Sequence, residues 1–84
     1  MTPELQEKLF KLVRKKFPRW SKLKASGYVH GVVNGIAAHF PKYPVPNGTY
    51  SEGYMYGYID AYGEDALPRG YRRKLEYRWW DDLL

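Results

Sequence analysis

The sequence predicts an all-α fold of about four short helices in one small domain that spans residues 1–84. Apolar side chains recur at three- and four-residue spacing in four segments, which is the period of an amphipathic helix. Hydroxyl side chains that can cap a helix precede three of these segments, and a proline or a glycine follows each of the three. No segment alternates apolar and polar residues for long enough to predict a strand.

The first helix is predicted to begin after Thr2, whose hydroxyl can cap it, with Pro3 in the first turn. Pro18 disfavours helical geometry just before it, so we expect the helix to end near Lys16. The apolar stripe of this helix consists of Leu5, Leu9, Leu12, Val13 and Phe17.

The second helix is predicted to follow the short connector Arg19-Trp20, with Ser21 as its cap. Pro41 is the first residue that would stop it, so we expect the helix to continue almost to that position. Its three glycines make it the weakest of the predicted helices on intrinsic propensity.

Residues 41–48 are predicted to form a loop, because three prolines and an Asn-Gly pair fall within them. Thr49 and Glu52 then have the spacing of a capping box directly before an apolar periodic run. The third helix should therefore run from Thr49 to about Gly63 or Glu64.

A fourth helix is predicted from about Pro68 or Gly70 to Asp81. Trp79 and Trp80 are adjacent, and adjacent positions of a helix point in different directions. One of these tryptophans should therefore lie at an edge or in an interface.

The centre of the chain contains a repeat, in which Ser26–Gly35 is answered 26 residues later by Glu52–Ala61. Residues four apart share a helix face, so each copy places three small residues in one ridge. A glycine inside a helix costs about 1 kcal/mol relative to alanine, so this ridge predicts close approach of two helices or of a ligand. The preferred interpretation is a helical hairpin packed through these ridges, and a groove for a partner is a second interpretation that need not exclude it. The proposed packing residues are Gly27, Gly31, Gly35, Gly53, Gly57 and Ala61, with Tyr28, Tyr54 and Tyr58 beside them.

Charge is distributed unevenly along the chain, which carries a net charge of +5. Residues 1–24 hold eight Lys/Arg and two Glu, for +6, and residues 67–84 hold five Lys/Arg and three acids, for +2. Residues 25–66 hold one Lys and four acids, for −3. Basic arms can attract an anionic partner such as nucleic acid, or can form a solvated helix face.

The sequence contains no cysteine, no phosphate-binding loop and no metal-binding motif, and His30 and His39 are too far apart to act as ligands on one helical turn. We therefore expect no enzymatic activity, metal, cofactor or small-molecule substrate. There is no secretory pattern, and the uncharged run from Ala25 to Pro41 is too short and too polar for a membrane span. These features predict a cytoplasmic protein without membrane contact.

The segment from Ser26 to Ala61 resembles ribosome modulation factor, a short bacterial protein family that drives ribosomes into hibernating dimers. Residues 27–31 read Gly-Tyr-x-x-Gly, as in the first half of that family's helical hairpin, and residues 54–61 read Tyr-x-x-Gly-Tyr-x-x-Ala, with tyrosines in place of the family's tryptophans. A Pro/Tyr element, Pro41-Lys42-Tyr43, lies between them. The resemblance implies a helical hairpin that contacts ribosomal RNA. The family's dense Arg/Lys beside the motif is missing here, which moves the expected RNA surface to the two arms.

The leading hypothesis is a non-enzymatic basic protein that binds RNA or the ribosome. The alternative is a phage-encoded inhibitor, for host takeover or anti-defence, that docks on a host nucleic-acid-processing protein through Trp79-Trp80 and the nearby arginines. A homodimer formed through an exposed tyrosine face is a third hypothesis, and Tyr43, Tyr50 and Tyr56 are expected to be partly exposed. The candidate nucleic-acid or partner contacts are Lys8, Lys11, Arg14, Lys15, Arg19, Lys22, Tyr43, Arg72, Arg73, Arg78 and Trp80.

Overall fold

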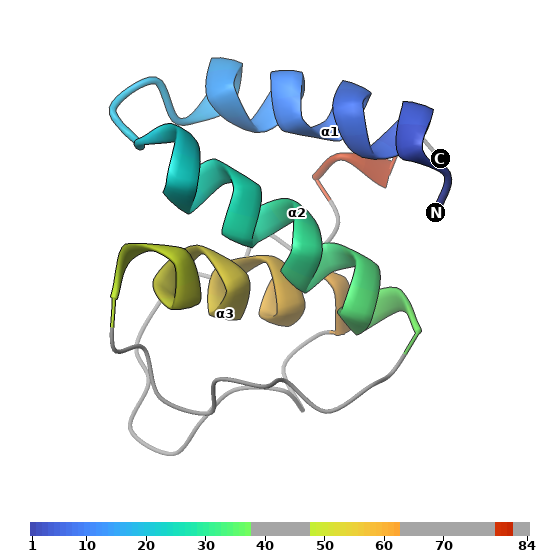
Figure 1. Cartoon of the computed structure of the whole chain (residues 1–84). Helices are drawn as coiled ribbons and strands as arrows, with labels where there is room; N and C mark the ends of the chain where they lie inside the picture. The colour runs from blue at the N-terminus through green and yellow to red at the C-terminus, as the bar shows by residue number, and fades with distance from the viewer. Residues whose placement is uncertain (38–47, 63–78, 82–84) are drawn as a thin grey trace.

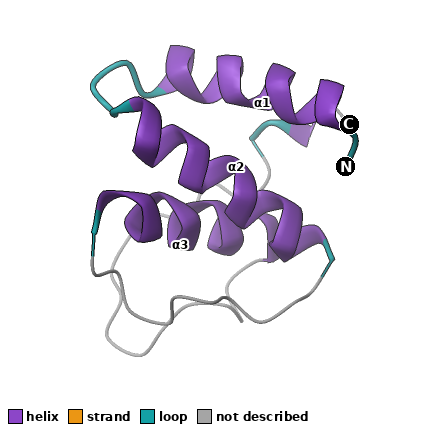
Figure 2. Ribbon diagram, viewed as in Figure 1, coloured by secondary structure: helices purple, strands orange, loops and turns teal. Residues whose placement is uncertain are grey.

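The computed structural model describes residues 1–37, 48–62 and 79–81, which contain three α-helices and no strand (Figures 1 and 2). The helices are α1 (Pro3–Lys16), α2 (Lys22–Ile36) and α3 (Thr49–Tyr62). The all-α prediction is confirmed for these residues. Most of the predicted fourth helix and of the 41–48 loop lies outside them.

Helix α1 begins and ends where its sequence predicts. The hydroxyl of Thr2 accepts a hydrogen bond from the backbone N–H of Leu5 at 3.2 Å, and a proline occupies the first turn. At the other end the N–H of Phe17 donates to the carbonyl of Val13 at 2.9 Å. Leu9 and Val13 are fully buried and fix the inward face of the helix.

Helix α2 starts as predicted, with the hydroxyl of Ser21 accepting from the N–H of Lys24 at 3.1 Å. It ends at Ile36, several residues before Pro41, so the predicted end is wrong. Its last turn contains Asn34 and Gly35, which have low helix propensity and do not favour continuation of the helix.

Helix α3 begins at Thr49, but the predicted capping box is not formed. The N–H of Glu52 donates to the carbonyl of Gly48 at 2.9 Å, which makes Thr49 the first helical residue rather than the cap. The carboxylate of Glu52 binds the ammonium of Lys24 in α2 at 2.8 Å. Glu52 therefore forms a tertiary ion pair with Lys24 instead of the capping interaction that the local pattern predicts.

The α2–α3 contact is built on glycine. A Cβ atom added to Gly31 would lie closer than 3.0 Å to the carbonyl oxygen of Tyr54, and one added to Gly57 would lie equally close to the carbonyl oxygen of Tyr28. Gly27, Gly35 and Gly53 meet backbone or Cβ atoms of the facing helix at similarly short range. The two small-residue ridges pack against each other, so they do not themselves line an open groove.

The two helices run in the same direction, which corrects the hairpin prediction (Figure 1). Gly27 lies against Tyr50 and Gly31 against Tyr54, so the residue numbers rise together along both helices. A helical hairpin is antiparallel. Residues 37–48 connect the helices, and twelve residues can span about 40 Å when extended. This length is more than enough to return along a helix that rises about 22 Å.

The sequence repeat corresponds to a local two-fold symmetry. Gly31 and Gly57 occupy the same place in the two copies, and each packs against the carbonyl of the residue three positions before its counterpart. The contact is therefore reciprocal, as in an isologous dimer interface, with the axis parallel to the helices. The repeat has become a two-fold helix pair within one chain.

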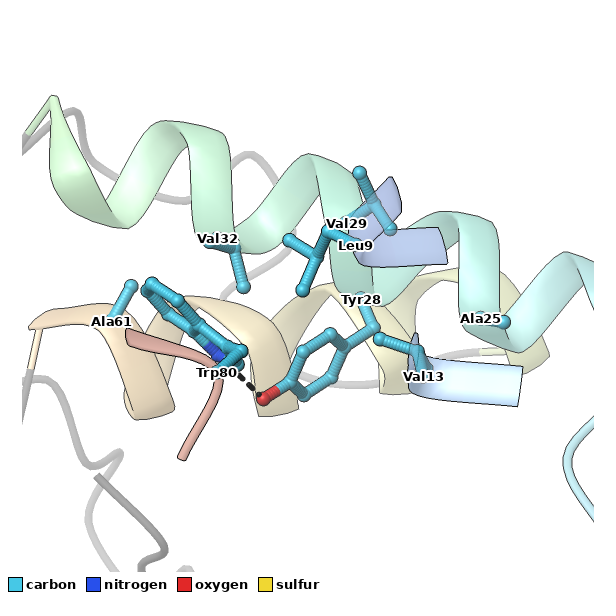
Figure 3. Close-up of a cluster of buried hydrophobic side chains, with 8 residues drawn as sticks. All are labelled: Leu9, Val13, Ala25, Tyr28, Val29, Val32, Ala61 and Trp80. Atoms are coloured by element: carbon cyan, nitrogen blue, oxygen red, sulfur yellow. Dashed lines mark hydrogen bonds between the residues drawn. The ribbon is translucent and has the colours of Figure 1, made fainter. Parts of the chain in front are cut away.

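Helix α1 packs on α2, on the side away from most of α3 (Figure 1). The largest buried cluster lies where α1, α2, α3 and the C-terminal Trp80 meet (Figure 3). Its members are Leu9, Val13, Ala25, Tyr28, Val29, Val32, Ala61 and Trp80. A second cluster on α3 consists of Tyr54, Met55, Tyr58 and Ile59.

Candidate functional site

The outward face of α1 carries three lysines, which we call the lysine stripe. Lys8, Lys11 and Lys15 are exposed and lie three and four positions apart, which places them on one face of the helix. The buried Leu9 and Val13 occupy the opposite side. The helix therefore presents a row of positive charge to the solvent.

Two further predicted cations, Arg19 and Lys22, are exposed beside the end of α1. Arg14 has a different place. Its guanidinium donates to the carbonyl of Trp20 at 2.7 Å and is half-buried. Arg14 therefore holds the connector between α1 and α2 against the helix.

The remaining predicted contacts do not join this surface. Trp80 is 2% exposed and belongs to the core, so its assignment as a partner contact is wrong. Its indole fills the space between α1, α2 and α3, which removes one anchor from the inhibitor hypothesis. Tyr43, Arg72, Arg73 and Arg78 lie outside the described residues.

Trp79 and Trp80 direct their indole N–H groups to one acceptor, the hydroxyl of Tyr28, at 2.7 and 3.1 Å. Figure 3 shows the second of these bonds, from Trp80. Neighbouring residues of a straight α-helix point about 100° apart and could not converge in this way. The backbone at Trp79 and Trp80 is accordingly a turn, which corrects the prediction that the fourth helix continues to Asp81.

The Tyr28 hydroxyl is also a donor, to the buried carboxylate of Asp60 at 2.5 Å. It thus gives one hydrogen bond and receives two, which uses its full capacity. The pKa of Tyr28 lies well above its usual range, because burial disfavours the phenolate and the Asp60 carboxylate repels it. This network was not predicted from the sequence. The available signal was the repeat, which places Asn34 and Asp60 at equivalent positions.

The two-fold axis relates this network to a second one. Asn34 donates its amide to the hydroxyl of Tyr54 at 2.6 Å, so the pair Tyr54–Asn34 repeats the pair Tyr28–Asp60. The predicted core role of both tyrosines fits their burial. Tyr58 is also buried, and Tyr62 is the exposed end of the same α3 ridge.

We expect the free energy of unfolding to fall as the pH rises above about 10, the ordinary pKa of tyrosine. The unfolded chain releases the Tyr28 proton there while the folded chain retains it, so this group alone lowers stability by about 1.4 kcal/mol per pH unit. Burial also raises the pKa of Tyr58, which adds to the trend. Urea midpoints measured at alkaline pH test this, and Tyr28→Phe should have a shallower slope. Constant stability above pH 10 would contradict it.

A cluster of aromatic rings lies at the end of α1. Trp20 stacks on Phe17 at a centroid distance of 4.2 Å and on Tyr56 at 5.6 Å. The ammonium of Lys24 lies 4.5 Å from the centroid of Trp20 and pairs with Glu52. The hydrogen bond from the ammonium of Lys24 lowers the pKa of Glu52. Tyr56 and Tyr50 are half-buried, and the Tyr50 hydroxyl bonds to Nδ1 of His30.

Within the described ranges, no three His, Cys, Asp or Glu side chains are placed to hold a metal ion. No helix in the same ranges is long and apolar enough to cross a membrane. Comparison of the chain with protein-family models, with curated proteins and with solved structures found no match. The described residues therefore define only a class, a helical protein with a parallel glycine-packed helix pair and an outward lysine stripe.

Proposed function

We propose that this chain is a non-enzymatic binding protein that contacts RNA, alone or within the ribosome, through the outward face of α1. The observation that carries the proposal is the lysine stripe, three exposed ammonium groups on one face of a capped helix. Arg19 and Lys22 extend the positive charge past the end of the helix. Phosphate groups are the natural ligand of such a surface, because lysine binds them as a point charge.

The resemblance to ribosome modulation factor lies in the Gly-Tyr motifs and not in the direction of the helices, and these motifs suggest RNA as the ligand. The Gly-Tyr segments of this chain are occupied by packing between α2 and α3. They are available for no other backbone, so RNA has to be bound elsewhere on the protein. Residues 1–24, which include α1, form the described surface with the required positive charge.

Helix α1 carries two acidic residues, Glu4 and Glu7, which are both exposed and lie four positions before Lys8 and Lys11. Glu7 pairs with Lys11 at 3.6 Å, and both side chains are at least 70% exposed. An ion pair this exposed contributes little and is readily exchanged for a phosphate contact.

The test is binding of ribosomes and of structured RNA to the full chain as a function of salt. We expect affinity to fall steeply as salt rises, because each phosphate contact releases counterions. Replacing Lys8, Lys11 and Lys15 together by glutamine should lower the slope of log K against log salt by about 2–3, at about 0.7–0.9 per contact. Affinity at moderate salt should fall at least tenfold, by the same loss of contacts.

The matched control is Glu7→Gln, which changes the same helix by one charge of the opposite sign. It should leave RNA affinity unchanged or tighter, because it frees Lys11. Circular dichroism checks that both variants remain helical. Absence of binding by the unaltered protein at low salt would reject the proposal, as would equal binding by the triple variant.

A further inference from the structure

We infer that the RNA bound by the lysine stripe is double-helical and is recognised through its phosphates, not through unpaired bases. The inference deepens the proposed function and rests on it. It follows from two observations, the geometry of the stripe and the state of the aromatic rings next to it.

The three lysines of the stripe are attached at fixed positions along one continuous helix. Lys8 and Lys15 are seven residues apart on one continuous helix, so their attachment points are separated by about 10 Å along its axis. The helix is capped by Thr2 at its start and anchored to the core by Leu9 and Val13. A row of lysines with fixed attachment points is best matched by a ligand whose phosphates are also held in fixed positions, and an RNA duplex provides this.

Proteins that hold unpaired RNA strands combine positive charge with aromatic rings on which bases stack. The described rings at the C-terminal end of α1 are already stacked on one another. Trp20 contacts Phe17 and Tyr56 and lies under the ammonium of Lys24. Trp79 meets Phe17 edge to face at 5.9 Å and lies under the ammonium of Lys16 at 4.9 Å.

Opening this cluster for a base would forfeit several contacts to make one. Each aromatic pair contributes to stability beyond the area that it buries, and a stacked base would restore only one such contact. Trp79 would in addition have to give up its hydrogen bond to Tyr28. We therefore assign the RNA contact to the lysines, and the aromatic rings stabilise the fold.

The experiment compares two labelled RNAs of equal length and phosphate number, one a hairpin and one without base pairing, by fluorescence anisotropy with the full chain. We expect the hairpin to bind at least about tenfold more tightly, because a duplex has the higher and more ordered charge density. The intrinsic tryptophan emission should not change on binding, whereas a base stacked on Trp20 or Trp79 would quench it. The triple lysine variant should lose its preference for the hairpin.

Equal affinity for the two RNAs, tighter binding of the unpaired RNA, or strong quenching at saturation would overturn the inference while leaving RNA binding in place. Failure of both RNAs to bind at low salt would instead reject the proposed function itself, and the inference with it. The two failures are therefore distinct.

Discussion

Gly31→Ala is expected to destabilise the protein by about 2–4 kcal/mol, although the same substitution in an exposed helix stabilises it by about 1 kcal/mol. The added Cβ would lie closer than 3.0 Å to the backbone of Tyr54 and Tyr58 in α3. Backbone cannot rotate aside as a flexible side chain can, so α2 and α3 must separate along their contact. Urea unfolding followed by circular dichroism measures the loss.

Gly57→Ala should cost about the same, because the two-fold relation places it against the backbone of Tyr28 in the same way. The double variant should lose less than the sum, because helices separated by the first substitution have already made room for the second. Gly48→Ser is the matched control. A Cβ at Gly48 meets nothing within 4 Å, and serine is a favoured helix cap. A stabilised Gly31→Ala variant would refute the close-contact interpretation.

Tyr28→Phe is expected to lower the free energy of unfolding by about 3 kcal/mol, the cost of disturbing several buried hydrogen bonds at once. The hydroxyl is the donor to Asp60 and the acceptor for the indoles of Trp79 and Trp80. The substitution keeps the ring and its packing, so the loss reports on the hydroxyl. Urea unfolding measures it.

Tyr62→Phe serves as the control, because Tyr62 is 43% exposed and water can fill the place of the hydroxyl that the substitution removes. Its effect should be below about 0.5 kcal/mol, as for most surface substitutions. Tryptophan emission should shift in Tyr28→Phe and stay unchanged in Tyr62→Phe, because the indoles of Trp79 and Trp80 lose their shared acceptor only in the first. Equal stability of the two variants would show that the network is not important for folding.

The helix starts could be predicted because they depend on neighbouring residues. Thr2 and Ser21 cap α1 and α2 as expected, and Pro18 ends the first helix within two residues of its position. The α3 cap was mispredicted because Lys24, far away in sequence, competes for Glu52. Capping preference contributes about 1 kcal/mol, so a tertiary ion pair combined with helix packing can override it.

The candidate site likewise contains some features that local sequence predicts and others that depend on tertiary contacts. The exposure of Lys8, Lys11 and Lys15 follows from the period of the apolar stripe on α1. The role of Arg14 depends on a carbonyl in the next segment, and the burial of Trp80 depends on the position of Tyr28. Trp20 lies beyond the end of α1, and Tyr28 is far from Trp80 in sequence, so helical periodicity reveals neither contact.

The sequence by itself determined the all-α class, the first residue of each described helix and the two small-residue ridges. Only the tertiary structure decided that α2 and α3 run parallel, and that Tyr28 joins Asp60 to the C-terminal tryptophans. The physical reason is that a ridge of glycines has the same four-residue spacing in both directions, so the pattern specifies contact without specifying orientation. Orientation depends on the packing of each glycine against one carbonyl of the facing helix.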